Sequence, residues 1–120
     1  MFMLNQICYM PKREIQLLLN DITENAEAVF QFIGDSDYEE FVNDKMKVYA
    51  VVRAFEIIGE ASKLVSVDVK SANPLIEWQL MADFRNILIH HYFGIDYQIL
   101  WQSIKESLPH NYEMLKLIKL

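Results

Sequence analysis

The segment RNILIHHYF, residues 85–93, holds the side chains best suited to chemistry in this chain. His90 titrates near neutrality and can accept or give a proton. Arg85 can bind a phosphate through two parallel hydrogen bonds and stabilise the charge that develops on it. Asn86 can orient the imidazole or donate to an oxyanion, and the Tyr92 hydroxyl can position a phosphate or accept a transferred group. Together these residue types suit metal-independent RNA cleavage, in which a ribose 2′-OH attacks the neighbouring phosphate.

The same residues also have structural explanations. A single histidine on a mostly apolar helix is more often a hydrogen-bonded core group, and Arg85 with Asn86 and His90 could form a structural network. His91 beside His90 could suggest a metal ion, but adjacent helical residues diverge and no acidic cluster at metal-ligand spacing accompanies them. We therefore expect no metal ion and no cofactor.

The mutual positions of these side chains depend on a predicted helix over residues 74–91, capped by Asn73, opened by Pro74 and ended by Gly94. On such a helix His90 lies about 140° from Arg85, too far to converge on one small group. Either the helix distorts near Gly94, or a second copy of the chain faces the first across a two-fold axis. We favour the second explanation, a homodimer with this helix near the axis.

The rest of the chain predicts an all-α protein. Apolar residues recur every three or four positions from Ile15 to Ile33, with Pro11 at the start of the helix and Gly34 at its end. A second helix is predicted over residues 36–65, with a capping box formed by Ser36 and Glu39 and a surface ion pair between Arg53 and Glu56. A further helix is capped by Asp96; Pro109 should end or kink it, and a shorter helix follows. We expect an antiparallel bundle of four to five helices in one domain, residues 1–120, in which residues 1–10 could be an N-terminal extension.

Charge and composition limit the possible functions. A net charge of −6 argues against general nucleic-acid binding, although basic residues slightly outnumber acidic ones from Lys45 onward. Every charged residue from Glu14 to Asp44 is acidic, which is typical of a solvated face and could also form a docking surface for a basic partner.

With one cysteine, no signal peptide and no apolar run long enough to span a membrane, we expect a cytoplasmic protein.

Arg85, His90 and Tyr92 match the R-x4-H-x-Y motif of the HEPN ribonucleases. The surrounding sequence resembles the HepT toxin branch, over roughly residues 11–115. Four pieces follow in that family's order: IIGEA at residues 57–61, EW at 77–78, RN…HHYFGID at 85–96 and LP at 108–109.

This resemblance implies a homodimer whose paired motifs form a metal-independent RNase site at the interface. It assigns catalysis to Arg85 and His90, with Asn86 and Tyr92 in support. It further implies the toxin of a type VII toxin–antitoxin system that cleaves cellular RNA, either tRNA or mRNA. The partner would be an MntA-like nucleotidyltransferase antitoxin, which neutralises the toxin by transferring AMP to Tyr92. Two alternatives remain open: a non-catalytic HEPN module that binds a nucleotidyltransferase, and a helical dimer with no ligand.

Overall fold

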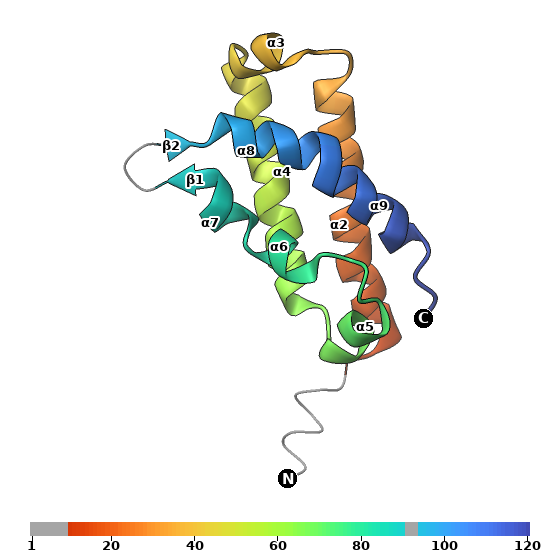
Figure 1. Ribbon diagram of the computed structural model, residues 1–120. Helices are drawn as coiled ribbons and strands as arrows, with labels where there is room; N and C mark the ends of the chain where they lie inside the picture. The colour runs from red at the N-terminus through yellow and green to blue at the C-terminus, as the bar shows by residue number, and fades with distance from the viewer. Residues whose placement is uncertain (1–9, 91–93) are drawn as a thin grey trace.

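The computed structural model describes residues 10–90 and 94–120, most of which lie in helices (Figure 1). In chain order the elements are α2 (Lys12–Ile33), α3 (Tyr38–Val42), α4 (Lys45–Leu64), α5 (Val67–Ala72), α6 (Trp78–Ala82), α7 (Phe84–Leu88), β1 (Ile89–His90), β2 (Gly94–Ile95), α8 (Tyr97–Gln102), the π-helical turn η1 (Ser103–Ser107) and α9 (Leu108–Lys116). The predicted all-α fold is confirmed, although the described residues also hold one antiparallel pair of two-residue strands. None of the helices in these residues is long and apolar enough to cross a membrane.

The two long helices α2 and α4 form an antiparallel pair that makes more contacts than any other pair of elements. Their buried residues alternate in steps of three and four, the spacing that keeps one face of a helix against a partner helix. In α2 these residues are Ile15, Leu19, Ile22, Ala26, Val29 and Ile33, and in α4 they include Val48, Val51, Phe55, Ile58 and Ser62. The predicted first helix is confirmed, and Gly34 ends it with a positive φ and an N–H bond to the Phe30 carbonyl.

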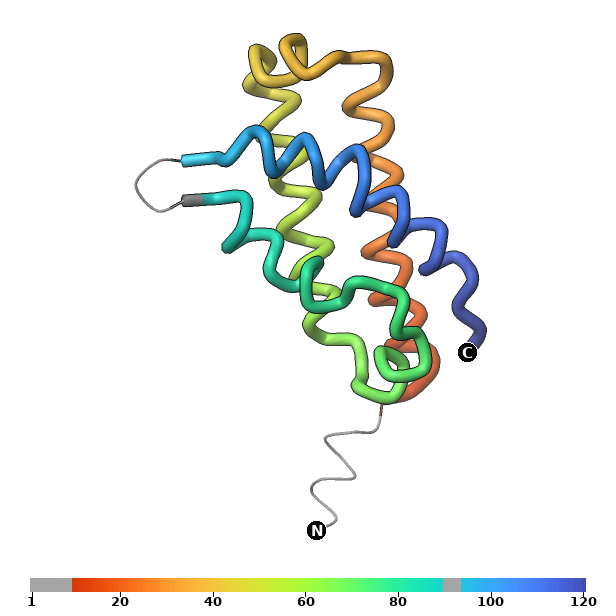
Figure 2. Tube along the Cα trace, viewed as in Figure 1, coloured from red at the N-terminus to blue at the C-terminus, as the bar shows by residue number. Residues whose placement is uncertain are grey.

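The C-terminal segment α8–η1–α9 runs obliquely in front of this pair in the view of Figure 1, and α9 packs on α2. Figure 2 follows the same path along the Cα trace. The Tyr112 ring meets Phe30 edge to face at 5.3 Å, and its hydroxyl donates to Glu27 at 2.6 Å. This hydrogen bond to a carboxylate raises the pKa of Tyr112. The hydrogen bond between Tyr112 and Glu27 therefore stabilises the fold below about pH 10. This stabilisation is lost as the pH rises through the raised pKa of Tyr112.

Helix α6 lies against α4 at Gly59. A Cβ at this position would be 3.0 Å from the Met81 carbonyl oxygen and 3.5 Å from that of Ala82. Next to this contact, Phe84 of α7 meets Phe55 of α4 edge to face, with 4.6 Å between the ring centroids. The backbone of α6 can approach α4 this closely because glycine has no side chain.

The predicted helix over residues 36–65 is wrong, because the chain forms α3 and α4 there. The capping box is formed by Asp37 and Glu40 instead of Ser36 and Glu39. Ser36 lies one residue before this cap, and its hydroxyl accepts a hydrogen bond from the Lys47 ammonium at 2.9 Å. Helix α4 starts afresh with its own cap, Asp44, whose side chain accepts from the Lys47 N–H.

The predicted helix over residues 74–91 is also wrong. Asn73 ends α5 instead of opening the next helix, and its side chain donates to the Val69 carbonyl. Helix α6 begins only at Trp78, the chain bends at Asp83, and α7 ends at Leu88.

The predicted cap of the following helix is confirmed, since the Asp96 side chain accepts from the Ile99 N–H at 3.1 Å. Pro109 was expected to end or kink this helix, yet the helical path continues through it. Proline lacks the N–H of a regular turn, and its ring crowds the carbonyl four residues back. The wider π-helical turn Ser103–Ser107 directly before α9 accommodates it.

We predict that Gly59→Ala destabilises the protein by about 1–3 kcal/mol, the usual cost of overpacking. The loss should appear although alanine is intrinsically better than glycine in a helix by about 1 kcal/mol. Urea-induced unfolding followed by circular dichroism measures it. Glu24→Ala, at an exposed position of α2, is the control and should change stability by less than about 0.5 kcal/mol. Equal or greater stability of Gly59→Ala would contradict the role of this contact.

Candidate active site between α4 and α7

Arg85 lies in the first turn of α7 with its side chain directed at α4. Its Nε is 3.4 Å from Oε2 of Glu56, and the side chains of Arg85 and Glu56 are 71% and 28% exposed. Among the described residues, Arg85 forms its ion pair with Glu56. The carboxylate therefore holds one edge of the guanidinium, and the terminal nitrogens remain accessible to a phosphate.

This contact corrects the predicted ion pair between Arg53 and Glu56. The spacing of three residues makes such a pair possible on an isolated helix, but α7 brings a competing cation to the same carboxylate. Arg53 instead lines the adjacent cleft.

The cleft between α4 and the α6–α7 segment has a volume of about 250 Å³. Its lining residues are Arg53, Glu56, Gly59, Glu60, Lys63, Ala82, Arg85 and Asn86. Three cations against two carboxylates give the cleft a local positive excess in a chain whose net charge is −6. A local positive excess favours the binding of an anion in this cleft.

The structure brings Arg85 and Asn86 together, since both are exposed and both line the cleft. His90 lies in β1, where its backbone pairs with Gly94, and no longer on the helix that carries Arg85. The angle of 140° expected between Arg85 and His90 is therefore wrong. The His91 and Tyr92 positions lie outside the described residues.

The chain leaves the helix after Leu88, whose carbonyl is bound by the residue that follows the hairpin. Ile89 adopts an extended conformation, and the Asp96 N–H donates to the Leu88 carbonyl at 2.7 Å. That bond satisfies a carbonyl that the end of α7 would otherwise leave unpaired. Gly94, with φ of +76°, supplies a backbone conformation that favours glycine at the return of the hairpin.

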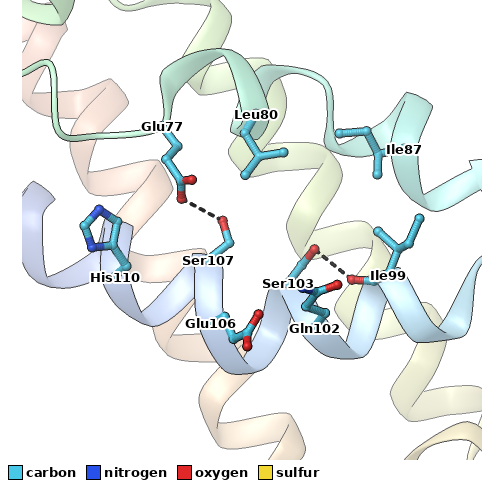
Figure 3. A pocket seen from close by; sticks show the side chains of 9 residues that line it. All are labelled: Glu77, Leu80, Ile87, Ile99, Gln102, Ser103, Glu106, Ser107 and His110. Carbon is cyan, nitrogen blue, oxygen red and sulfur yellow. Dashed lines mark hydrogen bonds between the residues drawn. The ribbon is translucent and has the colours of Figure 1, made fainter.

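A hydrogen-bond network around the buried Asn111 ties the start of α6 to the C-terminal helix. Asn111 is fully buried; its side chain accepts from the Glu77 N–H at 2.8 Å and donates to Glu77 Oε1 at 3.0 Å. The Ser107 hydroxyl donates to the same carboxylate oxygen at 3.2 Å (Figure 3). The sequence analysis missed this network. The available signal was a polar residue, Asn111, on the apolar stripe between Leu108 and Leu115.

A cavity of about 540 Å³ lies between the α6–α7 segment and the C-terminal helix. Figure 3 shows the side chains that line it. Leu80, Ile87 and Ile99 form its apolar part, and its charged residues are Glu77 and Glu106. Helix α7 gives Ile87 to this cavity and Arg85 to the cleft, so the helix separates the two. Because no lysine or arginine lines it, this cavity is poorly suited to a phosphate. In residues 10–90 and 94–120, no group of three or more potential metal ligands comes together.

The sequence model of the family described as "Ribonuclease HepT-like" matches residues 22–118. The chain belongs to this HepT-like family. It is 51% identical to the candidate RNase MJ1380 of Methanocaldococcus jannaschii over 83% of this chain and 92% of that protein. It is also 45% identical to a protein named as a probable ribonuclease HepT from Thermococcus cleftensis, over 82% of this chain and 89% of that protein. No solved structure matches the chain.

The family assignment confirms the resemblance drawn from the sequence, and the structure explains several of the segments that carried it. Gly59 is the contact point between α4 and α6. Glu77 is hydrogen-bonded to the buried Asn111. Gly94 supplies the positive φ of the hairpin. In this HepT-like protein, these segments position the α7 helix on which Arg85 and Asn86 lie.

Proposed function

We propose that this protein is a metal-independent endoribonuclease, the toxin of a type VII toxin–antitoxin system that cleaves cellular tRNA or mRNA in the cytoplasm. The observation that carries the proposal is the accessible Arg85 guanidinium, held at one edge by Glu56 in a cleft with a local positive excess. Membership of the HepT-like ribonuclease family supports the same conclusion.

The chemistry assigned to the cleft is attack of a ribose 2′-OH on the adjacent phosphate. The bond from the 2′-oxygen to phosphorus forms, and the bond from phosphorus to the 5′-oxygen breaks. His90 accepts the proton of the 2′-OH, and a protonated His90 returns a proton to the leaving 5′-oxygen. Arg85 binds the phosphate and stabilises its added negative charge, while Asn86 orients His90 or donates to a phosphate oxygen. The products are a 2′,3′-cyclic phosphate and a 5′-hydroxyl end.

We expect Arg85→Ala to lower the rate of RNA cleavage by about 10²–10³, the usual loss when a donor to a developing oxyanion is removed. His90→Ala should lower the rate by about 10²–10⁴, because it removes the proton-transfer group. The measurement is cleavage of a labelled RNA, with and without a chelator. Arg13→Ala and His110→Ala remove the same groups at exposed positions outside the cleft and serve as controls. Full activity of either cleft variant, or loss of wild-type activity on chelation, would contradict this mechanism.

We propose that the cleft is shared by two subunits related by a two-fold axis. The exposed face of α4 carries Met46, Tyr49 and Leu64, which are 84%, 61% and 61% exposed. It also carries the opposite charges of Arg53 and Glu60. An antiparallel packing of α4 on a second α4, with the axis near its middle, would place Arg53 beside Glu60 of the partner subunit. Tyr49 would then pack on Leu64 of the partner subunit. This face is self-complementary, as a two-fold interface requires.

That arrangement bears directly on the site. The axis would pass near Glu56, so the two Arg85–Glu56 pairs would lie on either side of it. We propose that the two His90 residues of the dimer serve this shared site, one imidazole as base and the other as acid.

Tyr49→Glu should convert the dimer to a monomer at micromolar concentration, because it places two new carboxylates in the packed face of α4. Light scattering measures the mass. Leu117→Glu is the matched control: Leu117 is 69% exposed near the C-terminus and outside the proposed interface, so this variant should remain dimeric. A monomeric wild type, or an unaffected Tyr49→Glu, would overturn the interface.

We further propose that an MntA-like nucleotidyltransferase controls the toxin by transferring AMP from ATP to Tyr92. The tyrosine oxygen attacks the α-phosphorus of ATP, its proton leaves, and pyrophosphate is released. Tyr92 follows His90 by two positions in the sequence. The phosphate of the attached AMP can therefore pair with Arg85 of the same or the partner subunit, as the RNA phosphate would. The attached AMP would thus inhibit RNA cleavage by occupying the place of the substrate, without unfolding the protein.

Tyr92→Phe should escape modification because the ring remains and the acceptor oxygen is removed. Intact-protein mass spectrometry after incubation with the antitoxin and ATP detects the added AMP. Tyr97→Phe, at the start of α8, is the control and should be modified like the wild type. If Tyr92→Phe gains the same mass as the wild type, another residue is the acceptor.

A further inference from the structure

A third hollow lies between α3 and the start of the C-terminal helical segment, with a volume of about 420 Å³. Its lining combines aromatic, amide and charged side chains: Tyr38, Gln98, Trp101, Gln102, Lys105 and Glu106. The mechanism proposed above uses none of these residues.

Trp101 forms the aromatic wall of this hollow and is held in place by two other rings. Its centroid is 5.5 Å from that of the buried Phe41 and 5.8 Å from that of Tyr38, which it meets edge to face. The Trp101 side chain is nevertheless only partly buried. A ring fixed in orientation and open to solvent loses little conformational freedom when a flat ligand stacks on it.

Lys105 completes the arrangement, since its Nζ lies 4.8 Å from the centroid of the Trp101 ring. A cation in this position interacts with the face of the indole. A stacked ligand could displace the ammonium from the ring while the flexible lysine turns to a phosphate attached to that ligand. Gln98 and Gln102 supply amide donors and acceptors at the rim.

We propose that this hollow is a stacking subsite for one unpaired nucleobase of an RNA substrate, an inference that rests on the ribonuclease function proposed above. Single-stranded RNA is bound in general by aromatic stacking, amide hydrogen bonds to base edges and cations at the phosphates. The Trp101 ring, the two glutamines and Lys105 provide these three elements. A purely apolar ligand is disfavoured because four of the six lining residues are amides or charged.

The position of the subsite fits this role. Helix α8 begins two residues after β2, whose Gly94 pairs with the backbone of His90. From Tyr97 to Trp101 the helix rises only about 6 Å. Trp101 therefore lies about one helical turn along the chain from the start of α8, which follows the hairpin that carries His90. The larger cavity of Figure 3 offers no comparable site, because neither an aromatic ring wide enough for a base nor a lysine lines it.

The charges in the hollow nearly cancel, since Glu106 adjoins Lys105. Affinity at this subsite should therefore come from stacking, with Lys105 directing the strand and Glu106 opposing the phosphate. Glu106→Gln should accordingly bind RNA more tightly than the wild type does.

The test uses a short single-stranded oligoribonucleotide whose 2′-hydroxyls are methylated, so that it binds and is not cleaved. The chain has two tryptophans, and Trp78→Phe leaves Trp101 as the only fluorophore of this kind. Binding should quench the Trp101 emission in a saturable manner. An oligonucleotide of abasic residues, which keeps the phosphates and lacks the bases, should leave the emission unquenched.

Two variants measure the contribution of the subsite to RNA affinity. Trp101→Leu keeps an apolar contact with Phe41 and removes the stacking face, and should weaken binding about 5- to 150-fold. Lys105→Ala should also weaken binding. Its matched control is Lys116→Ala, because the Lys116 ammonium lies over the Tyr112 ring at 4.3 Å and carries the same charge. Circular dichroism of each variant verifies that the helices remain.

Wild-type affinity of Trp101→Leu, equal quenching by the abasic strand, or equal weakening by Lys105→Ala and Lys116→Ala would each overturn the subsite. None of these results would affect RNA cleavage by Arg85 and His90, which is measured separately. Conversely, an absence of cleavage by the wild type would overturn the proposed ribonuclease function, whereas the fluorescence experiment reports on base binding alone.

Discussion

The backbone contact at Gly59 determines where α6 lies, and the candidate site depends on that position. The Met81 carbonyl would come within 3.0 Å of any Cβ at this point, so every other residue type would push α6 away from α4. The hydrogen bonds between the buried Asn111 and Glu77 hold the start of the same helix against the C-terminal helix. Helix α7 follows after a bend at Asp83 and carries Arg85 to Glu56. A short helix thus gains from packing and buried hydrogen bonds the fixed position that its own length could not provide.

The Arg85–Glu56 contact orients more than it stabilises. Both groups are partly exposed, and surface ion pairs contribute between zero and about 1 kcal/mol. Glu56 nevertheless limits the positions of the long, flexible Arg85 side chain, because its carboxylate contacts Nε of the guanidinium. An incoming phosphate can then meet the remaining nitrogens of a guanidinium that is already close to its working position, which lowers the entropic cost of binding.

The sequence supports prediction best where a structural signal is local. The apolar repeat of α2, its end at Gly34 and the cap at Asp96 all rest on residues a few positions apart, and all are confirmed. The predicted helix over residues 74–91 failed because three distant contacts decide that region: Gly59 with Met81, Glu77 with Asn111, and Leu88 with Asp96. In the candidate site, Arg85 and Asn86 line one cleft, and their assigned roles in catalysis stay a prediction. The role of Glu56 was missed because helical spacing assigned it to Arg53, whereas its partner comes from another helix. The family was recognised correctly because the resemblance rests on short motifs and their order along the chain, which do not depend on where a helix ends.

An acidic ribonuclease has a particular constraint on how it binds its substrate. With a net charge of −6, the chain as a whole repels RNA, and the acidic faces of α2 and α3 can contribute nothing to phosphate binding. The cleft is one place of local attraction, because Arg53, Lys63 and Arg85 outnumber two carboxylates there. Non-specific binding, which depends on the number of neutralised phosphates, should therefore be weak. Affinity for RNA must then come from contacts of defined geometry, such as hydrogen bonds from the Arg85 guanidinium to a phosphate and stacking of a base on the Trp101 ring. Such a protein gains little from duplex RNA, whose bases are already stacked, and most from a strand with an unpaired base near the bond to be cleaved.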